Sequence, residues 1–127
     1  MTKTSVVAWH GSPHKFDRFD FSKLRDSLGV FFSEKQEHAE QYGSARKYRL
    51  TFGNLLRVRQ GREYAEHVSM RGGTNCGRDV RRRLLAAGYD GVHIEYDGGA
   101  VEYVAFSNRN IMPITTAKRH TMRGKSG

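Results

Sequence analysis

Glu102 is the residue whose setting most strongly suggests chemistry. It lies in the run Val101-Glu102-Tyr103-Val104-Ala105-Phe106, whose β-branched and aromatic residues predict a strand. Because alternate residues of a strand share a face, Glu102 shares its face with the apolar Val104 and Phe106. A carboxylate on an apolar face is costly unless it has a partner or works in a cleft. From the strand pattern alone, a functional glutamate and an edge-strand glutamate that faces water are equally supported.

His10 is a second candidate, because it stands where an expected strand over residues 5–9 gives way to a turn. Gly11 and Ser12 follow it directly, and a residue that lacks a Cβ lets a ligand approach the backbone closely. A turn that carries a surface histidine is the ordinary alternative. Taken alone, this short segment favours the ordinary alternative, since motifs of this length have low specificity.

Aromatic side chains form a third candidate. Phe31 and Phe32 end an expected strand over residues 29–32, and Tyr42 lies further on, at the last turn of an expected helix. Packing of the three rings in the core is the ordinary alternative, and spacing alone favours it.

An expected helix over residues 78–87 has one apolar and one basic side. Its apolar side consists of Val80, Leu84 and Ala87, and its basic side carries Arg78, Arg81, Arg82 and Arg83. A solvated helix face is the favoured interpretation of these arginines, and a phosphate-contacting surface is the alternative. The net charge of +9, from 22 Lys and Arg against 13 Asp and Glu, would attract nucleotides, nucleic acid and acidic protein surfaces alike.

Other reactive side chains do not form a recognisable site. His93 and Glu95 alternate on an expected strand, but no third ligand is near in sequence, so we expect no metal. Cys76 is the only cysteine, which excludes an internal disulfide and fits a reducing compartment. No apolar run approaches the roughly 20 residues that span a bilayer, and residues 1–10 do not resemble a secretory signal. We therefore expect a soluble, cytoplasmic protein that does not enter a membrane.

The elements that must position these residues are short. The patterns predict strands and two helices that do not alternate strictly, which is typical of the α+β class. The expected strands cover residues 5–9, 29–32, 47–52, 55–59, 91–96, 101–106 and 110–115, and the expected helices end near Tyr42 and Ala87. A capping box at Ser33–Gln36 starts the first helix, and Gly53-Asn54 predicts a hairpin turn. Residues 60–76 are expected to be irregular.

The chain is expected to form one domain. Its 127 residues are enough for a hydrophobic core without disulfides or metals, and no internal repeat or linker divides them. The domain is placed at residues 1–117. Residues 118–127 are polar and basic with no apolar period, which predicts a disordered tail.

Taken together and in order, the three segments resemble the motifs of the ADP-ribosyltransferase superfamily. The His-Tyr-Glu branch, which includes diphtheria toxin and the poly-ADP-ribose polymerases, is the most similar. Its pattern is His-Gly-Ser or His-Gly-Thr after the first strand, a Gly-x-Tyr-Phe strand with a second Tyr further on, and a Glu that opens a strand. The counterparts here are His10-Gly11-Ser12, Gly29-Val30-Phe31-Phe32 with Tyr42, and Glu102-Tyr103-Val104-Ala105-Phe106.

The sequence is still more similar to small ADP-ribosyltransferase domains of phage and mobile-element proteins. The shared stretches are residues 10–20, 29–34, 39–42 and 88–92, together with the Glu102 strand. No single stretch is specific, but their order is, and the resemblance covers roughly residues 5 to 114. It implies a single small α+β domain, built from two packed, mostly antiparallel β-sheets with a few helices.

The resemblance also implies a role for each residue, with NAD⁺ as the substrate and no metal. His10 would bind the adenosine-side ribose, the Gly11 backbone would hold the nicotinamide carboxamide, and Phe31 with Tyr42 would sandwich the nicotinamide ring. Glu102 would accept from the 2′-hydroxyl of the nicotinamide ribose, as in glycoside hydrolysis. The implied catalytic residues are Glu102, His10 and Tyr42, and the implied NAD⁺-binding residues are His10, Gly11, Ser12, Phe31, Phe32, Ala39 and Tyr42.

Three positions depart from the pattern of the relatives. Phe31 stands where a tyrosine is usual, which keeps stacking but removes a hydroxyl contact. Ala39 stands where several relatives have a serine that bonds the carboxamide, so weaker binding of NAD⁺ is expected. Ala100 stands two residues before Glu102, where the arginine-modifying branch has a second acidic residue, so arginine is disfavoured as the acceptor.

These features predict a NAD⁺-dependent mono-ADP-ribosyltransferase. The resemblance points to a phage or mobile element as its source and to a host macromolecule as its target, a protein first and a nucleic acid second. Elongation into poly-ADP-ribose is not expected of so small a domain. Three alternatives remain open: a NAD⁺ glycohydrolase with the same site, an RNA 2′-phosphotransferase, against which Glu102 argues, and a non-catalytic basic domain that binds nucleic acid.

Overall fold

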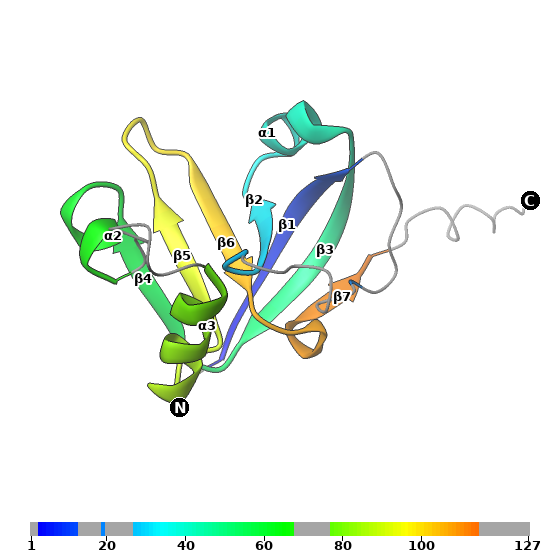
Figure 1. Ribbon diagram of the computed structural model, residues 1–127. Helices are drawn as coiled ribbons and strands as arrows, with labels where there is room; N and C mark the ends of the chain where they lie inside the picture. The colour runs from blue at the N-terminus through cyan, green and yellow to red at the C-terminus, as the bar shows by residue number, and fades with distance from the viewer. Residues whose placement is uncertain (1–2, 13–18, 20–26, 68–76, 115–127) are drawn as a thin grey trace, which may run out of the picture.

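A computed structural model describes residues 3–12, 19, 27–67 and 77–114 of the chain (Figure 1). Buried residues alternate with more exposed ones over residues 48–52 and 55–59, as is typical of strands. The strands are β1 (Thr4–Ser12), β2 (Val30–Ser33), β3 (Ser44–Phe52), β4 (Leu55–Arg59), β5 (Gly91–Glu95), β6 (Val101–Ala105) and β7 (Ile111–Pro113). The helices are α1 (Gln36–Ala39), α2 (Arg62–His67) and α3 (Gly77–Ala86), with 3-10 turns at Glu40–Tyr42 and Asn108–Asn110. This content confirms the α+β class.

The described strands join in one hydrogen-bonded order, β4-β5-β6-β2-β1-β3-β7. Only β4 and β5 run parallel, and every other neighbouring pair is antiparallel. The expected pair of separate sheets is therefore replaced by a single mixed sheet. The seven strands still make two layers, because side chains of β3 pack on side chains of β6.

The sheet nearly divides between β1 and β2. These strands meet at one pair of residues, Trp9 and Ser33, whereas β1 pairs with β3 along its whole length. We call this place the β1–β2 seam. The two halves on either side of the seam pack face to face, because Phe52 of β3 stacks on Tyr103 of β6 with ring centroids 6.4 Å apart, although β3 and β6 are not neighbours.

Two hydrophobic clusters lie on opposite faces of β6. Tyr103 and Ala105 point into the cluster between the two halves of the sheet, and Val104 and Phe106 point into the cluster that α3 covers. The first cluster also contains Ala8, Phe19, Val30, Phe32, Tyr48, Leu50 and Phe52, and the second also contains Leu28, Leu56, Val58, Val80, Leu84, Val92 and Ile94. The predicted alternation along the Glu102 strand is thus confirmed.

The predicted capping box at Ser33–Gln36 is wrong. Ser33 is the last residue of β2, is 5 % exposed and pairs with Trp9 on one side and Glu102 on the other. Lys35 is the N-cap of α1, and no side chain caps the helix. Strand pairing on both sides of Ser33 outweighs the local preference for a cap, so the helix starts later and is shorter than expected.

The predicted hairpin at Gly53-Asn54 is also wrong, because β4 pairs in parallel with β5 and not with β3. The Asp90 carboxylate accepts from the backbone N–H groups of Gly53, at 2.7 Å, and of Asn54, at 3.0 Å. The Asn54 side chain donates to the Gly88 carbonyl at 3.0 Å. These bonds tie the turn to the loop before β5, which directs β4 away from β3.

Asp90 is accordingly expected to support the fold. Its carboxylate also accepts from the Asn110 side chain at 3.2 Å, so Asp90→Ala leaves three donors without this acceptor. Unpaired donors of this kind cost about 2 kcal/mol in total at a partly exposed site. Urea denaturation should show this loss, whereas Asp79→Ala, which removes an exposed carboxylate from α3, should cost less than about 1 kcal/mol. Equal losses for the two variants would contradict the role given to Asp90.

Of the remaining helices, one was predicted in large part and one was missed. Helix α3 has Val80 and Leu84 buried as predicted, and Gly88 follows it at a φ of 100°, but the helix ends at Ala86 and Ala87 is exposed instead of sharing the apolar face. Helix α2 lies within residues 60–76, which were expected to be irregular. The predicted tail at 118–127 lies outside the described residues, as does Cys76. In the described part of the chain, no helix has the length and apolar composition needed to cross a bilayer.

Candidate active site

Glu102 opens β6 and is only partly buried, on the face that α3 covers further along the sheet. The Tyr96 hydroxyl donates to its Oε1 atom at 2.6 Å. Tyr96 follows β5, so the bond crosses the turn that connects β5 to β6. The carboxylate predicted on an apolar face thus has a partner, and that partner fixes one of its two oxygens.

Aromatic side chains lie on the same face of the sheet as this pair. Phe31, Tyr64 and Tyr96 are partly buried and pack against the cluster under α3. Burial raises the pKa of Tyr96 most, the bond to Glu102 and its charge add to the rise, and Tyr64 and Tyr42 contribute in the same direction. Tyr42 is therefore close enough to the pair to interact with it electrostatically. Its side chain is 66 % exposed, so Tyr42 is not packed in the core, which was the alternative to a binding role.

His10 is held on the other side of the β1–β2 seam. Its Nδ1 atom is 2.8 Å from the carbonyl oxygen of Phe31, and its ring packs edge-on against Phe19 with centroids 5.0 Å apart. Burial lowers the pKa of His10, and the bond to Phe31 opposes that shift in part. In the neutral ring, Nδ1–H donates to the carbonyl and Nε2 is the acceptor atom.

The lowered pKa gives a testable pH dependence. Burial also lowers the pKa of His93, so the folded protein takes up protons at these rings less readily than the unfolded chain, whose histidines titrate near 6.5. The part of the unfolding free energy that depends on these histidines should therefore be greatest above pH 6.5. It should decrease as the pH falls below 6.5.

Urea denaturation at several pH values between 7.5 and 5 checks this expectation. His10→Gln should flatten the fall, because glutamine can keep a bond to the Phe31 carbonyl but does not titrate. His93→Gln should remove a separate share of the fall. A His10→Gln variant that loses stability with acid as steeply as the wild type would contradict the assignment.

Gly11 and Ala39 touch through their backbones. A Cβ at Gly11 would collide with the carbonyl group of Ala39, and Ala39 itself is 2 % exposed. Gly11 therefore has a structural reason to lack a side chain, since it lets the end of β1 approach α1. The sequence pattern suggested a ligand reason instead, and the two are compatible.

The other predicted NAD⁺-binding residues occupy different surroundings. Phe32 is 1 % exposed and belongs to the cluster between the halves of the sheet, so its side chain offers no surface to a ligand. Ser12 ends β1 and pairs with Ser44 of β3. Phe31 connects the candidate residues, because its carbonyl faces His10 while its ring lies on the Glu102 face.

The arginines of α3 lie toward the opposite end of the sheet from Glu102. The Arg81 guanidinium donates to the Ser27 carbonyl at 2.6 Å and approaches that of Leu28, so Arg81 anchors the segment that leads into β2. Arg78 lies 3.6 Å from the Asp79 carboxylate. In the described residues, no group of three or more His, Cys, Asp or Glu side chains could hold a metal ion.

The site includes two residues that the sequence did not indicate, Tyr96 and Tyr64. Gly98-Gly99 signalled a turn, and pairing the strands around it would have set Tyr96 diagonal to Glu102 on the same face. No comparable signal was available for Tyr64, because its helix was missed.

A family model described as ADP-ribosyltransferase in polyvalent proteins matches residues 4–120. The chain belongs to this family of ADP-ribosyltransferases. The match spans the whole described structure, from β1 to β7, and includes each of the candidate residues. It supports transferase activity in general.

A solved structure supports the fold of this ADP-ribosyltransferase domain. A protein described as an anti-CRISPR protein aligns with a TM-score of 0.55 and 18 % identity, covering 87 % of this chain and 96 % of the other. At that identity the likeness concerns the fold alone. No curated protein matches the ADP-ribosyltransferase chain in sequence.

Proposed function

We propose that the protein cleaves NAD⁺ at the bond between nicotinamide and ribose and transfers a single ADP-ribose unit to a macromolecule. The observation that carries this proposal is the Glu102 carboxylate, which accepts from the Tyr96 hydroxyl on the sheet face where the Phe31 ring also lies, in a member of an ADP-ribosyltransferase family. A carboxylate next to aromatic faces suits a substrate that is cationic and becomes more so as it reacts.

The proposed reaction uses the residues on both sides of the β1–β2 seam. Phe31 and Tyr42 would flank the nicotinamide ring, whose positive charge aromatic faces favour. Glu102 would accept from the 2′-hydroxyl of the attached ribose, which stabilises the positive charge that develops as the C–N bond breaks. The bonding electrons leave with neutral nicotinamide, and a nucleophile of the acceptor then attacks the ribose carbon and loses its proton. His10 would bind the second ribose.

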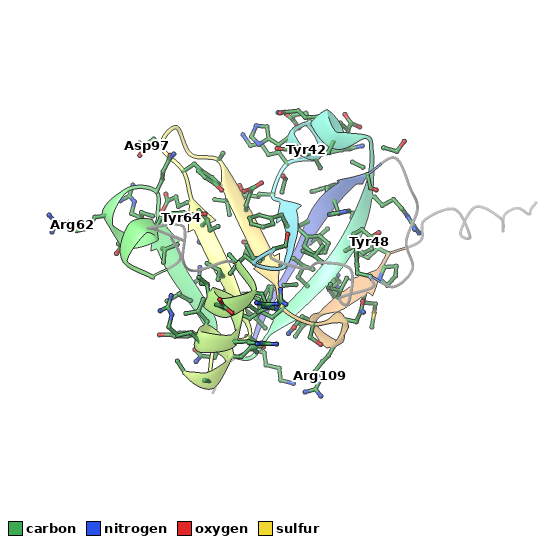
Figure 2. All side chains as sticks on the ribbon, in the orientation of Figure 1. Tyr42, Tyr48, Arg62, Tyr64, Asp97 and Arg109 are labelled. Atoms are coloured by element: carbon green, nitrogen blue, oxygen red, sulfur yellow. The ribbon has the colours of Figure 1, made fainter. Side chains whose placement is uncertain are left out.

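We propose a protein as the acceptor. Glu34, Glu37, Glu40, Glu95 and Asp97 lie at the end of the sheet where β6 begins, next to α1 and the β5–β6 turn. Figure 2 places Tyr42 and Asp97 at this end and Arg109 at the other. Carboxylates near Glu102 repel a phosphate backbone and attract a basic protein surface. The arginines of α3 lie toward the other end of the sheet, so they do not offset these carboxylates.

The proposed biological setting is a phage or mobile element that acts against its host. Two findings motivate this: the family description refers to polyvalent proteins, and a protein of the same fold is described as an anti-CRISPR protein. The target would then be a component of host machinery in the host cytoplasm, which the transfer of ADP-ribose alters by adding a bulky, doubly negative group.

Labelled NAD⁺ separates the proposed transferase from the alternatives. Host-cell lysate is incubated with the protein and NAD⁺ labelled in its adenine part, and the macromolecules are then precipitated and treated with protease or nuclease. We expect the label in the precipitate, released by protease and not by nuclease. Label in soluble ADP-ribose would identify a NAD⁺ glycohydrolase, nuclease-sensitive label would identify a nucleic-acid acceptor, and intact NAD⁺ would refute an enzyme of this kind.

A further inference from the structure

We propose that Tyr96 is a positioning residue, which holds the Glu102 carboxylate in its reactive orientation before the substrate arrives. The inference rests on the proposed function and adds to it, because neither the family pattern nor the sequence assigns a role to this tyrosine. Three features of the molecule support this role: the bond between Tyr96 and Glu102, the β5–β6 turn, and the side chains that brace the turn.

The bond between Tyr96 and Glu102 is short and directed. Its length of 2.6 Å is typical of a hydroxyl that donates to a charged carboxylate. Burial and the neighbouring Glu102 charge raise the pKa of Tyr96, so the hydroxyl keeps its proton and can only act as a donor to the carboxylate in neutral solution. The bond uses one lone pair of Oε1, so it holds the carboxylate in one orientation while leaving it able to accept from the substrate hydroxyl.

The β5–β6 turn sets the position of both residues. The Tyr96 N–H donates to the Ala100 carbonyl at 2.8 Å, and the Gly99 N–H donates to the Tyr96 carbonyl at 3.0 Å. Gly98 and Gly99 have φ values of 92° and 95°, which side chains disfavour, so this tight turn suits only glycine. The turn therefore leaves Tyr96 diagonal to Glu102, within reach of its carboxylate.

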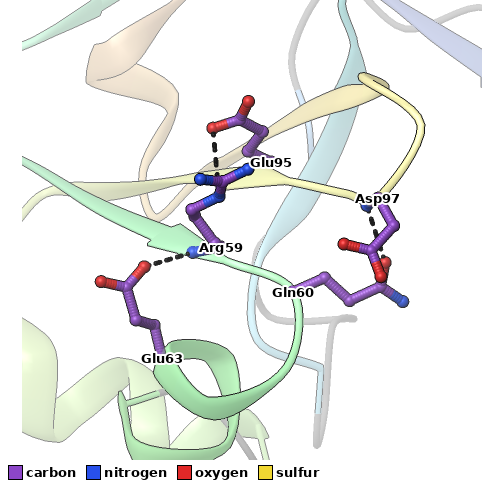
Figure 3. Close-up of polar contacts among 5 residues, drawn as sticks. All are labelled: Arg59, Gln60, Glu63, Glu95 and Asp97. Atoms are coloured by element: carbon purple, nitrogen blue, oxygen red, sulfur yellow. Dashed lines mark hydrogen bonds and ion pairs between the residues drawn. The ribbon is translucent and has the colours of Figure 1, made fainter.

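A network from β4 and α2 braces this turn (Figure 3). The Gln60 side-chain oxygen accepts from the Asp97 N–H at 3.0 Å, and the Gln60 N–H donates to the Glu95 carbonyl at 2.8 Å. Arg59 lies 3.8 Å from the Glu95 carboxylate, and its N–H donates to Glu63 at 2.9 Å. Glu95 and Asp97, which flank Tyr96, are thus both bonded to Gln60. Through Arg59, Glu95 is also connected to β4 and to Glu63 of α2.

This bracing explains why Tyr96 would orient the carboxylate instead of following it. A flexible hydroxyl would move with Glu102 and give no preference for one orientation. Gln60 restrains both neighbours of Tyr96 from outside the turn, so the hydroxyl acts as a fixed donor. Catalytic groups gain from such supports, because a preoriented carboxylate loses less freedom when the transition state forms.

The variant Tyr96→Phe tests the inference, since it removes the hydroxyl and keeps the ring. We expect kcat for nicotinamide release to fall by about tenfold or more, the effect of losing a hydrogen bond to a charged group. The KM for NAD⁺ should stay nearly unchanged, because the hydroxyl is bonded to Glu102 and not to the substrate. Tyr89→Phe is the matched control: Tyr89 packs against the same cluster, away from the turn, and its variant should keep the wild-type kcat.

A second variant distinguishes an effect on orientation from an effect on folding. Gln60→Ala removes one brace of the turn but leaves Tyr96 in place, and should lower kcat about threefold, again without raising KM. Thermal melting of each variant is measured beside the kinetics. A loss of kcat that follows only the melting temperature across the variants would show a merely structural role and overturn the inference.

Glu102→Gln separates the two proposals. If the wild type releases nicotinamide and Glu102→Gln does not, while Tyr96→Phe is as active as the wild type, the inference is overturned and the proposed function stands. If the wild type leaves NAD⁺ intact, the proposed function is overturned and the inference with it. A loss of kcat in both Glu102→Gln and Tyr96→Phe, with unchanged KM in the latter, supports both.

Discussion

Glu102→Gln is expected to lower kcat for nicotinamide release by about 100-fold or more and to leave the fold intact. Glutamine has the shape of glutamate and can accept the same bond from Tyr96. It lacks the negative charge that stabilises the developing cation, and preorganised electrostatic groups of this kind contribute about 10²- to 10³-fold to kcat. Nicotinamide release at saturating NAD⁺, together with thermal melting, measures the two effects separately.

Asp79→Asn is the control for this variant. Asp79 lies on α3, next to Arg78 and outside the site, and the substitution likewise exchanges a carboxylate for an amide. It should change kcat less than about twofold. A Glu102→Gln protein that releases nicotinamide at the wild-type rate would remove Glu102 from the mechanism.

Gly11→Ala is expected to have the largest effect on stability. The added Cβ would overlap the carbonyl group of Ala39, whose carbon atom would lie 2.6 Å away. Both partners belong to the backbone, so neither can rotate aside, and either β1 or α1 must move. Overpacking of this kind costs about 3 kcal/mol. We expect a corresponding loss of unfolding free energy in urea, together with lower NAD⁺ cleavage.

Gly53→Ala provides the comparison for this substitution. A Cβ at Gly53 would lie 3.6 Å from the Asp90 carboxylate, which is ordinary contact, so the stability should change by less than about 1 kcal/mol. If Gly11→Ala keeps the stability of the wild type and loses only NAD⁺ cleavage, Gly11 serves the ligand and not the packing of α1.

The face of the Glu102 strand could be predicted from the sequence, because alternation depends only on neighbouring residues. Glu102 was placed correctly beside Val104 and Phe106 in this way, and the face of α3 followed from helical spacing. Strand partners depend on contacts far apart in the sequence. The Gly53-Asn54 turn has the residues of a hairpin, yet Asp90 holds its N–H groups, and β4 joins β5 instead.

The candidate site shows the same difference between what local sequence patterns predict and what contacts distant in the sequence decide. His10, Phe31 and Tyr42 could be selected because their order along the chain resembles a known pattern. Tyr96 is part of no such pattern, and the role inferred for it follows from a turn and from Gln60, which lies between β4 and α2. The packing reason for Gly11 was equally hidden, since Ala39 approaches it only when α1 folds back over β1.

The most direct test of the central claim is mass spectrometry of the proteins in host-cell lysate after incubation with NAD⁺ and the purified protein. Wild-type protein should produce an adduct with the mass of one ADP-ribose on a specific acceptor, and Glu102→Gln should not. The account would be contradicted if wild-type protein gave no such adduct, or if the Glu102→Gln variant gave it to the same extent.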